Sequence, residues 1–296
     1  MPASPTRLAT LIVALTGVLW GFYWLPVRAL EGLGLSGALG TVALTLAAVV
    51  MLAPVALARR SLAGADGWAV AAVALGGAAF ALYSVAFLQG RVAMVILLYF
   101  LTPVWSVMIG RFLLGWPVAP LRLAAIGLGL AGLVIMLAGD GTWPIPEAPG
   151  EWMGLAAGLM WSVSTTGIRV RPGLDPVASA LVFSAGALVL ALVAVPLMGP
   201  WPPVAVVEAP VAAIALALAA AALWWVGTIL GLLWATARLD PARVGILLMT
   251  EVAVGAGSAA WLAGEHLAPL ELAGGALVLA AGVLEVWPER RGKAAA

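Results

Sequence analysis

Long apolar runs separated by short polar breaks fill this sequence, and their length decides how the chain is built. Ten runs of roughly 20 residues match the length at which an α-helix crosses the hydrocarbon core of a membrane. The expected spans are approximately 8–28, 37–58, 68–88, 92–114, 120–139, 152–170, 176–198, 211–236, 243–263 and 268–287. They leave only short connections, so we expect an all-α integral membrane protein without a separate soluble domain.

The fourth run, Val92–Leu114, predicts more than a membrane span. It begins with 18 uncharged residues, which suffice to cross a bilayer. Tyr99, Thr102 and Ser106 would share one helix face, and such a polar stripe faces protein or water rather than lipid. Pro103 removes one backbone donor and predicts a kink, which hydrocarbon tolerates only where neighbours or a cavity satisfy the freed carbonyl.

Composition supports the membrane assignment. Hydrophobic residues make up 64% of the chain and charged residues 9%, far from the balance of soluble domains. The 35 glycines predict close helix packing through small side chains. A net charge of +1 without a basic patch gives no indication of nucleic acid. We expect no metal or other cofactor and no enzymatic activity, because the chain has no cysteine, one histidine and a single deep carboxylate.

Basic residues predict the orientation. With a cytoplasmic N-terminus, twelve of the 14 basic residues fall on the inside, and only Arg28 and Arg91 fall outside. Both termini are then cytoplasmic.

The two halves of the chain repeat one another weakly. A shift of 141 residues places Trp20 on Trp161, and a shift of 149 places Gly115 on Gly264. Since each half holds five spans, an odd number, the second unit must be inverted relative to the first, as in many secondary transporters. The predicted units are residues 1–139, a linker over 140–151, and residues 152–296.

These features resemble a known family. The segment GVLWGFYWLPVRAL in the first span, and the segments that close each half, FLLGWPVAPLRLAAIGLGLAGLVIML and WLAGEHLAPLELAGGALVLAAGVLEV, are similar to the EamA family of the drug/metabolite transporter (DMT) superfamily. Its glycine–glutamate element matches Gly264 and Glu265, whereas the first half has Trp116 after Gly115. Within the superfamily the chain looks most like the YddG-type aromatic amino acid exporters.

The resemblance implies ten helices around a central cavity in the bacterial cytoplasmic (inner) membrane. It also implies export of aromatic amino acids by alternating access. Other neutral amino acids, other hydrophobic metabolites or drugs remain open as substrates, and a non-transporting membrane scaffold is the alternative from another class. The sequence leaves the oligomeric state open.

Seven residues are candidates for substrate binding. Trp20 and Trp161 are repeat equivalents and would meet near the pseudo-two-fold axis, where they line a cavity or simply pack. Other polar side chains inside spans could orient a ligand in an apolar pocket or could serve as hydrogen bonds between helices. These are Tyr83, Tyr99, Ser164 and Thr165.

Glu251 is the one acid well inside a span, which makes it a candidate for function. It would bind a substrate ammonium or a coupling proton, or it locks helices together by a hydrogen bond. Pro26 and Pro103 are the candidate hinges. Glu265 is expected to serve the turn before the last span, and His266 to lie in a solvated loop.

Overall fold

The computed structural model describes residues 5–115, 120–137, 146–171, 173–198, 207, 209–236, 247–248 and 250–286. Within these residues the regular structure is helical throughout. The helices are α1 Pro5–Gly21, α2 Trp24–Gly32, α3 Leu39–Ala58, α4 Gly67–Ala86, α5 Val92–Tyr99, α6 Thr102–Phe112, α7 Pro120–Leu137, α8 Pro149–Val170, α9 Pro176–Met198, α10 Pro210–Ala220, η2 Ala221–Gly227, α11 Thr228–Thr236, α13 Thr250–Leu262 and α14 Pro269–Val286.

Six helical stretches among the described residues are long and apolar enough to cross a membrane. They are Thr6–Gly32, Leu39–Ala58, Gly67–Ala86, Val92–Phe112, Pro176–Met198 and Pro210–Leu232. The all-helical fold and the membrane character predicted from the sequence are therefore confirmed. The other four predicted spans also lie on helices, α7, α8, α13 and α14, but these do not meet the same length and hydropathy.

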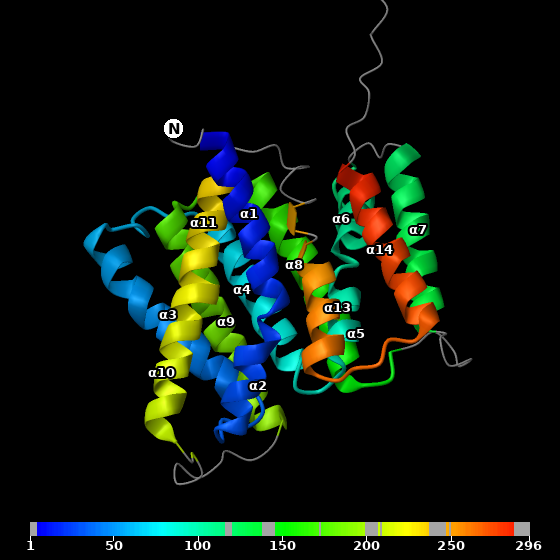
Figure 1. Cartoon of the computed structure of the whole chain (residues 1–296). Helices are drawn as coiled ribbons and strands as arrows, with labels where there is room; N and C mark the ends of the chain where they lie inside the picture. Colours follow the sequence, from blue (N-terminus) through cyan, green and yellow to red (C-terminus); the bar gives the residue numbers. More distant parts are fainter. Residues whose placement is uncertain are drawn as a thin grey trace, which may run out of the picture.

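The helices form one bundle (Figure 1), and α5 lies in its interior. All eight residues of α5 are buried, and this helix packs against α8 and α13. Next to it, α4 packs on α8 and α9, whereas α7 and α14 lie side by side at one edge of the bundle. The beginning of α1 and the end of α14 lie at the same end of the bundle (Figure 1).

Glycines bring α4 and α9 into backbone contact. A Cβ atom at Gly77 would overlap the carbonyl oxygen of Phe183, and one at Gly186 would overlap that of Ala74. Between membrane helices, where the hydrophobic effect gives little attraction, such close approach supplies van der Waals contact. The prediction of packing through small residues is confirmed at this contact.

Two of the long stretches are broken in the middle. The first changes direction at Phe22 and Tyr23, between α1 and α2, and the fourth at Phe100 and Leu101, between α5 and α6. Each break lies just before a candidate hinge proline. The kink predicted in the fourth span is confirmed. It divides the residues expected to form one polar face, because residue 99 ends α5 and residues 102 and 106 belong to α6.

A third irregularity lies in the predicted span 211–236. Its central residues, Ala221–Gly227, form a π-helical segment that carries Trp224 and Trp225. Such segments are rare and occur often at functional sites.

The predicted division into two units and a linker remains a prediction. Residues 140–145 of the predicted linker lie outside the described part of the chain, and its last residues already belong to α8, which begins at Pro149.

Gly77→Ala tests the contact between α4 and α9. We expect the free energy of unfolding to fall by about 1–3 kcal/mol, because the added methyl group meets a backbone carbonyl that cannot rotate away. Gly127→Ala in α7 is the matched control, since a Cβ there has nothing within 4 Å. Thermal unfolding in detergent measures both variants, and equal stability would contradict this packing.

Candidate functional site

At the break between α5 and α6, side-chain hydroxyls donate hydrogen bonds to backbone carbonyls. Pro103 has no N–H to donate to the carbonyl of Tyr99, its partner in a regular helix. The hydroxyl of Thr102 donates to that carbonyl at 2.7 Å. Ser162 of α8 donates to the carbonyl of Thr102 at 3.0 Å. The sequence-based expectation that neighbours satisfy the freed carbonyl is therefore confirmed.

At the break between α1 and α2, side chains from the second half of the chain donate hydrogen bonds to backbone carbonyls. The indole of Trp224, in the π-helical segment, donates to the carbonyl of Leu19 at 2.6 Å. Ser258 of α13 donates to the carbonyl of Gly21 at 3.2 Å and accepts a hydrogen bond from the indole of Trp24 at 3.0 Å. The irregular backbone at this depth thus depends on side chains more than 200 residues away in sequence.

Aromatic side chains meet beside these breaks, and we call nine of them the aromatic cluster. They are Trp20, Tyr23, Phe80, Tyr83, Phe87, Tyr99, Trp161, Phe183 and Trp225. Tyr83 and Tyr99 stack with ring centroids 4.4 Å apart, and Trp20 meets Trp161 edge to face at 6.5 Å. Both halves of the chain contribute rings, so the cluster lies where the halves face each other.

Glu251 projects into this cluster. Its side chain is only 1% exposed, and the hydroxyl of Tyr83 donates to its carboxylate at 3.1 Å. A buried carboxylate is costly in an apolar interior, so Glu251 stays a candidate for function, with a hydrogen bond that locks helices together as the alternative. Among the described residues, no group of three acidic or histidine side chains could hold a metal ion.

Three other polar side chains of the cluster, those of Trp20, Tyr23 and Trp225, are hydrogen-bonded within the protein. Trp225 donates from its indole to the hydroxyl of Tyr23 at 3.0 Å, and Tyr23 donates to Ser84 at 3.1 Å. The indole of Trp20 donates to Thr228 at 2.9 Å. These bonds fix the orientation of the rings on one side of the cluster.

The structure brings together five of the seven predicted binding residues: Trp20, Tyr83, Tyr99, Trp161 and Glu251. The remaining two bond to backbone carbonyls. Ser164 donates to Ala72 of α4 at 2.7 Å, and Thr165 donates to Trp161 within its own helix at 2.9 Å. A binding role for all seven stays a prediction, and so does the hinge role of Pro26 and Pro103.

Sequence reasoning missed several members of the cluster. Phe80 and Phe87 lie three residues before and four residues after Tyr83, so helical spacing alone places them on its face. Tyr23, the third tyrosine, follows Trp20 by three residues and could have been found in the same way. Phe183 had no comparable signal, because only the packing of α9 on α4 brings it to the cluster.

A charged group lies at the end of the bundle where α13 connects to α14. The carboxylate of Glu265 accepts hydrogen bonds from the backbone N–H groups of Val92, at 2.8 Å, and Ala93, at 3.1 Å. The expectation that Glu265 serves its own turn is therefore wrong. That role belongs to Glu271, which accepts from the N–H of Ala268 at 2.9 Å because it is at the third position of α14.

Arginines complete this charged group. Arg28 lies 3.5 Å from Glu265, and Arg91 forms a double hydrogen bond with Glu271. The bond to Glu271 raises the pKa of the Arg91 guanidinium above its ordinary value, so this arginine stays charged.

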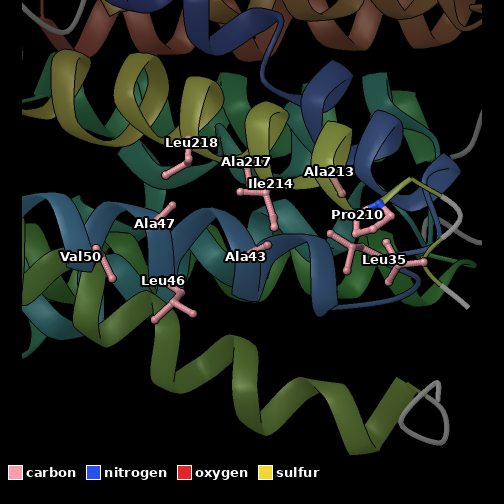
Figure 2. Close-up of a pocket in the computed structure, with 11 residues that line it drawn as sticks. Leu35, Ala43, Leu46, Ala47, Val50, Pro210, Ala213, Ile214, Ala217 and Leu218 are labelled. Atoms are coloured by element: carbon pink, nitrogen blue, oxygen red, sulfur yellow. The ribbon is translucent and has the colours of Figure 1, made fainter. Parts of the chain in front are cut away.

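A separate apolar groove of about 380 Å³ runs between α3 and α10, away from the charged group. Figure 2 shows Leu46 and Val50 of α3 and Ile214 and Leu218 of α10 along this groove. Its lining is almost entirely hydrocarbon, so it offers no polar group that could orient an amino acid.

Comparison with known proteins shows a similarity in fold and nothing about function. No family model matches the sequence, and no curated protein matches it. The fold is similar to a solved crystal structure of a protein whose description states no function, with 20% sequence identity and a TM-score of 0.61. The similarity covers 97% of this chain and 99% of the other. The EamA resemblance stays a prediction.

Thr102→Val tests the hydrogen bond from the Thr102 hydroxyl at the α5–α6 break. Removing the hydroxyl leaves the carbonyl of Tyr99 without this donor, so we expect a loss of about 1–3 kcal/mol in the free energy of unfolding. Thr165→Val is the control, because its hydroxyl bonds to carbonyls of an unbroken helix. Thermal unfolding of both variants in detergent gives the comparison, and an equal effect would argue against a special role for Thr102.

Proposed function

We propose that this chain is a secondary transporter that exports aromatic amino acids across a bacterial cytoplasmic membrane by alternating access. The observation that carries the proposal is the buried carboxylate of Glu251 inside a cluster of aromatic rings drawn from both halves of the chain. The resemblance of the sequence to EamA-type exporters supports it.

The chemistry of the cluster suits an aromatic amino acid. The carboxylate of Glu251 can pair with a substrate ammonium, and the adjacent rings of Tyr99 and Trp161 offer edges and faces to a substrate ring. Tyr83 carries both functions, since its hydroxyl bonds to Glu251 while its ring stacks on Tyr99. A site with one carboxylate among aromatic rings suits a substrate that carries one ammonium group and an aromatic ring.

The pattern of helix contacts supports ten spans arranged as two inverted five-span repeats. In the predicted repeat, α8 corresponds to α1, and α13 corresponds to the span formed by α5 and α6. The contact of α1 with α13 therefore corresponds to the contact of α8 with α5 and α6, and both contacts occur. The same correspondence relates the contact of α4 with α8 to that of α11 with α1, and the contact of α4 with α9 to that of α3 with α10 and η2. Gly115 and Gly264, aligned by the repeat, have φ of 65° and 67°.

Alternating access requires that the closed cluster open. Trp20, Tyr83 and Tyr99 are each at most 4% exposed, so a substrate enters only after the helices move. The breaks before Pro26 and Pro103 lie next to the cluster and are the natural places for that movement, because their backbone is held by side chains instead of a continuous helix. The excess of basic residues on one side supports cytoplasmic termini.

Flux measurements in proteoliposomes that contain only this protein test the proposal. Labelled tryptophan and phenylalanine are expected to cross selectively, with weak competition by alanine, lysine or lipophilic drugs. Movement of the drugs alone would replace the proposed substrate class with hydrophobic compounds. Absence of flux for the whole panel would overturn the proposal and favour a scaffold.

Trp161→Ala tests the aromatic cluster. We expect the flux of tryptophan to fall by about tenfold. Trp161 contacts the rings of Trp20 and Tyr99, and losing one or two aromatic contacts between this ring and a bound substrate costs about 1–1.5 kcal/mol. Trp261→Ala is the matched control, because that side chain on α13 is 83% exposed. Flux is normalised to folded protein, and equal flux in the two variants would remove Trp161 from the site.

Glu251→Gln and Tyr83→Phe test the carboxylate. If Glu251 binds the substrate ammonium, Glu251→Gln raises the substrate concentration for half-maximal flux by about tenfold or more. Tyr83→Phe, which removes one hydrogen bond to the carboxylate, is expected to have a smaller effect in the same direction. If only the dependence on a proton gradient disappears, Glu251 is a coupling group instead. Unchanged flux in both variants would leave Glu251 with a structural role.

A further inference from the structure

The two arginines that the charge distribution places on the outer side are both held in ion pairs. Arg28 of α2 pairs with Glu265, and Arg91, directly before α5, pairs with Glu271. Glu265 belongs to the connection between α13 and α14, and Glu271 belongs to the first turn of α14. Figure 1 shows this connection at the lower ends of the two helices. These ion pairs therefore join the last two helices of the chain to α2 and α5.

Glu265 also caps a helix to which it does not belong. The first N–H groups of a helix have no partner within the helix, and α5 is buried along its whole length. Arg91, at the position before α5, makes no side-chain cap. The carboxylate of Glu265, which is 10% exposed, accepts from Val92 and Ala93 instead, where negative charge also suits the helix dipole.

The backbone before Glu265 is built for this contact. Gly264 has φ of 67°, a conformation that residues with a side chain rarely adopt. This turn follows the end of α13, the helix that carries Glu251.

The opposite end of α5 lies in the aromatic cluster. Tyr99, its last residue, stacks on Tyr83, and Tyr83 bonds to Glu251. Between the two ends, Arg28 donates to the carbonyl of Phe87 at 3.3 Å, and the ring of Phe87 lies 4.6 Å from that of Tyr83. The charged group and the cluster are therefore connected through one short helix and one aromatic layer.

We propose that Glu265, Arg28, Arg91 and Glu271 form a latch that closes this end of the aromatic cluster. When Glu265 leaves the N-terminus of α5, the connection between α13 and α14 separates from α2 and α5, and the cluster becomes accessible from that side. Glu265 is a positioning residue, because it acts through α5 and touches no substrate. The inference rests on the proposed transport function for its biological meaning, but the opening itself can be measured without a substrate.

Accessibility of an introduced thiol tests the latch, and the absence of native cysteine makes the measurement clean. The reporter is Ser84→Cys, a buried position whose hydroxyl bonds to Tyr23 of the cluster. A membrane-impermeant methanethiosulfonate reagent is added to one face of reconstituted vesicles at a time. Exposed His266, replaced by cysteine in a separate protein, identifies the face on which the latch lies.

The reporter is combined with Glu265→Gln, Arg91→Gln or the control Glu31→Gln. Glu31 is an exposed acid of α2, three residues after Arg28, so its replacement removes a charge from the same helix end without touching the latch. With Glu265→Gln we expect labelling about tenfold faster than in the control, the effect of losing one charge-assisted hydrogen bond. The increase should occur only from the face at which position 266 reacts, and Arg91→Gln should give a smaller increase from that face.

Labelling rates equal to the control in both variants, or faster labelling only from the opposite face, would overturn the latch. Arg91→Gln keeps the test decisive if Glu265→Gln fails to fold, because Arg91 is 41% exposed and its side chain caps no helix. Tryptophan flux is measured separately on the native chain, without the reporter cysteine. Absent flux with latch-dependent labelling would refute the transport proposal alone, whereas normal flux with latch-independent labelling would refute the latch alone.

Discussion

The interior of this protein depends on satisfying backbone groups where its helices break. In hydrocarbon a free carbonyl or N–H has no water to pair with, so a broken helix persists only if side chains replace the missing bonds. Thr102 supplies such a bond at the α5–α6 break and Ser258 does so at the α1–α2 break, while Ser162 and Trp224 donate further hydrogen bonds to carbonyls beside the two breaks. Three of these four donors come from the second half of the chain, so the breaks tie the two halves together.

The same breaks determine where the aromatic cluster forms. Tyr99 ends α5 at one break, and Trp20 lies one residue before the end of α1 at the other. Both rings therefore lie where the backbone is irregular. Trp161 of α8 contacts both rings, which makes α8 the common wall of the cluster. A carboxylate placed among these rings, with Tyr83 as its hydrogen-bond donor, gives the cluster its only acidic group among the described side chains.

Charge at the end of the bundle serves the backbone as well. Glu265 supplies the acceptors that the buried start of α5 lacks, and Glu271 does the same for its own helix. The arginines that neutralise these acids are partly exposed, so their ion pairs add modestly to stability. Their geometric effect is larger, because they place the α13–α14 connection against α2 and α5.

Sequence alone determined the features that follow from the order of residues along one helix: the all-helical membrane class, the approximate bounds of the long apolar helices, the kink at Pro103 and the candidacy of Trp20, Tyr83, Tyr99, Trp161 and Glu251. These are local properties of length, hydropathy and ring or charge content. Tertiary structure alone decided that Ser164 and Thr165 bond to backbone, that Phe183 joins the cluster, and that Glu265 caps α5 across 172 residues of sequence. No periodicity records such pairings, because they arise when helices distant in sequence pack and each buried polar group takes whichever partner the packing brings within reach.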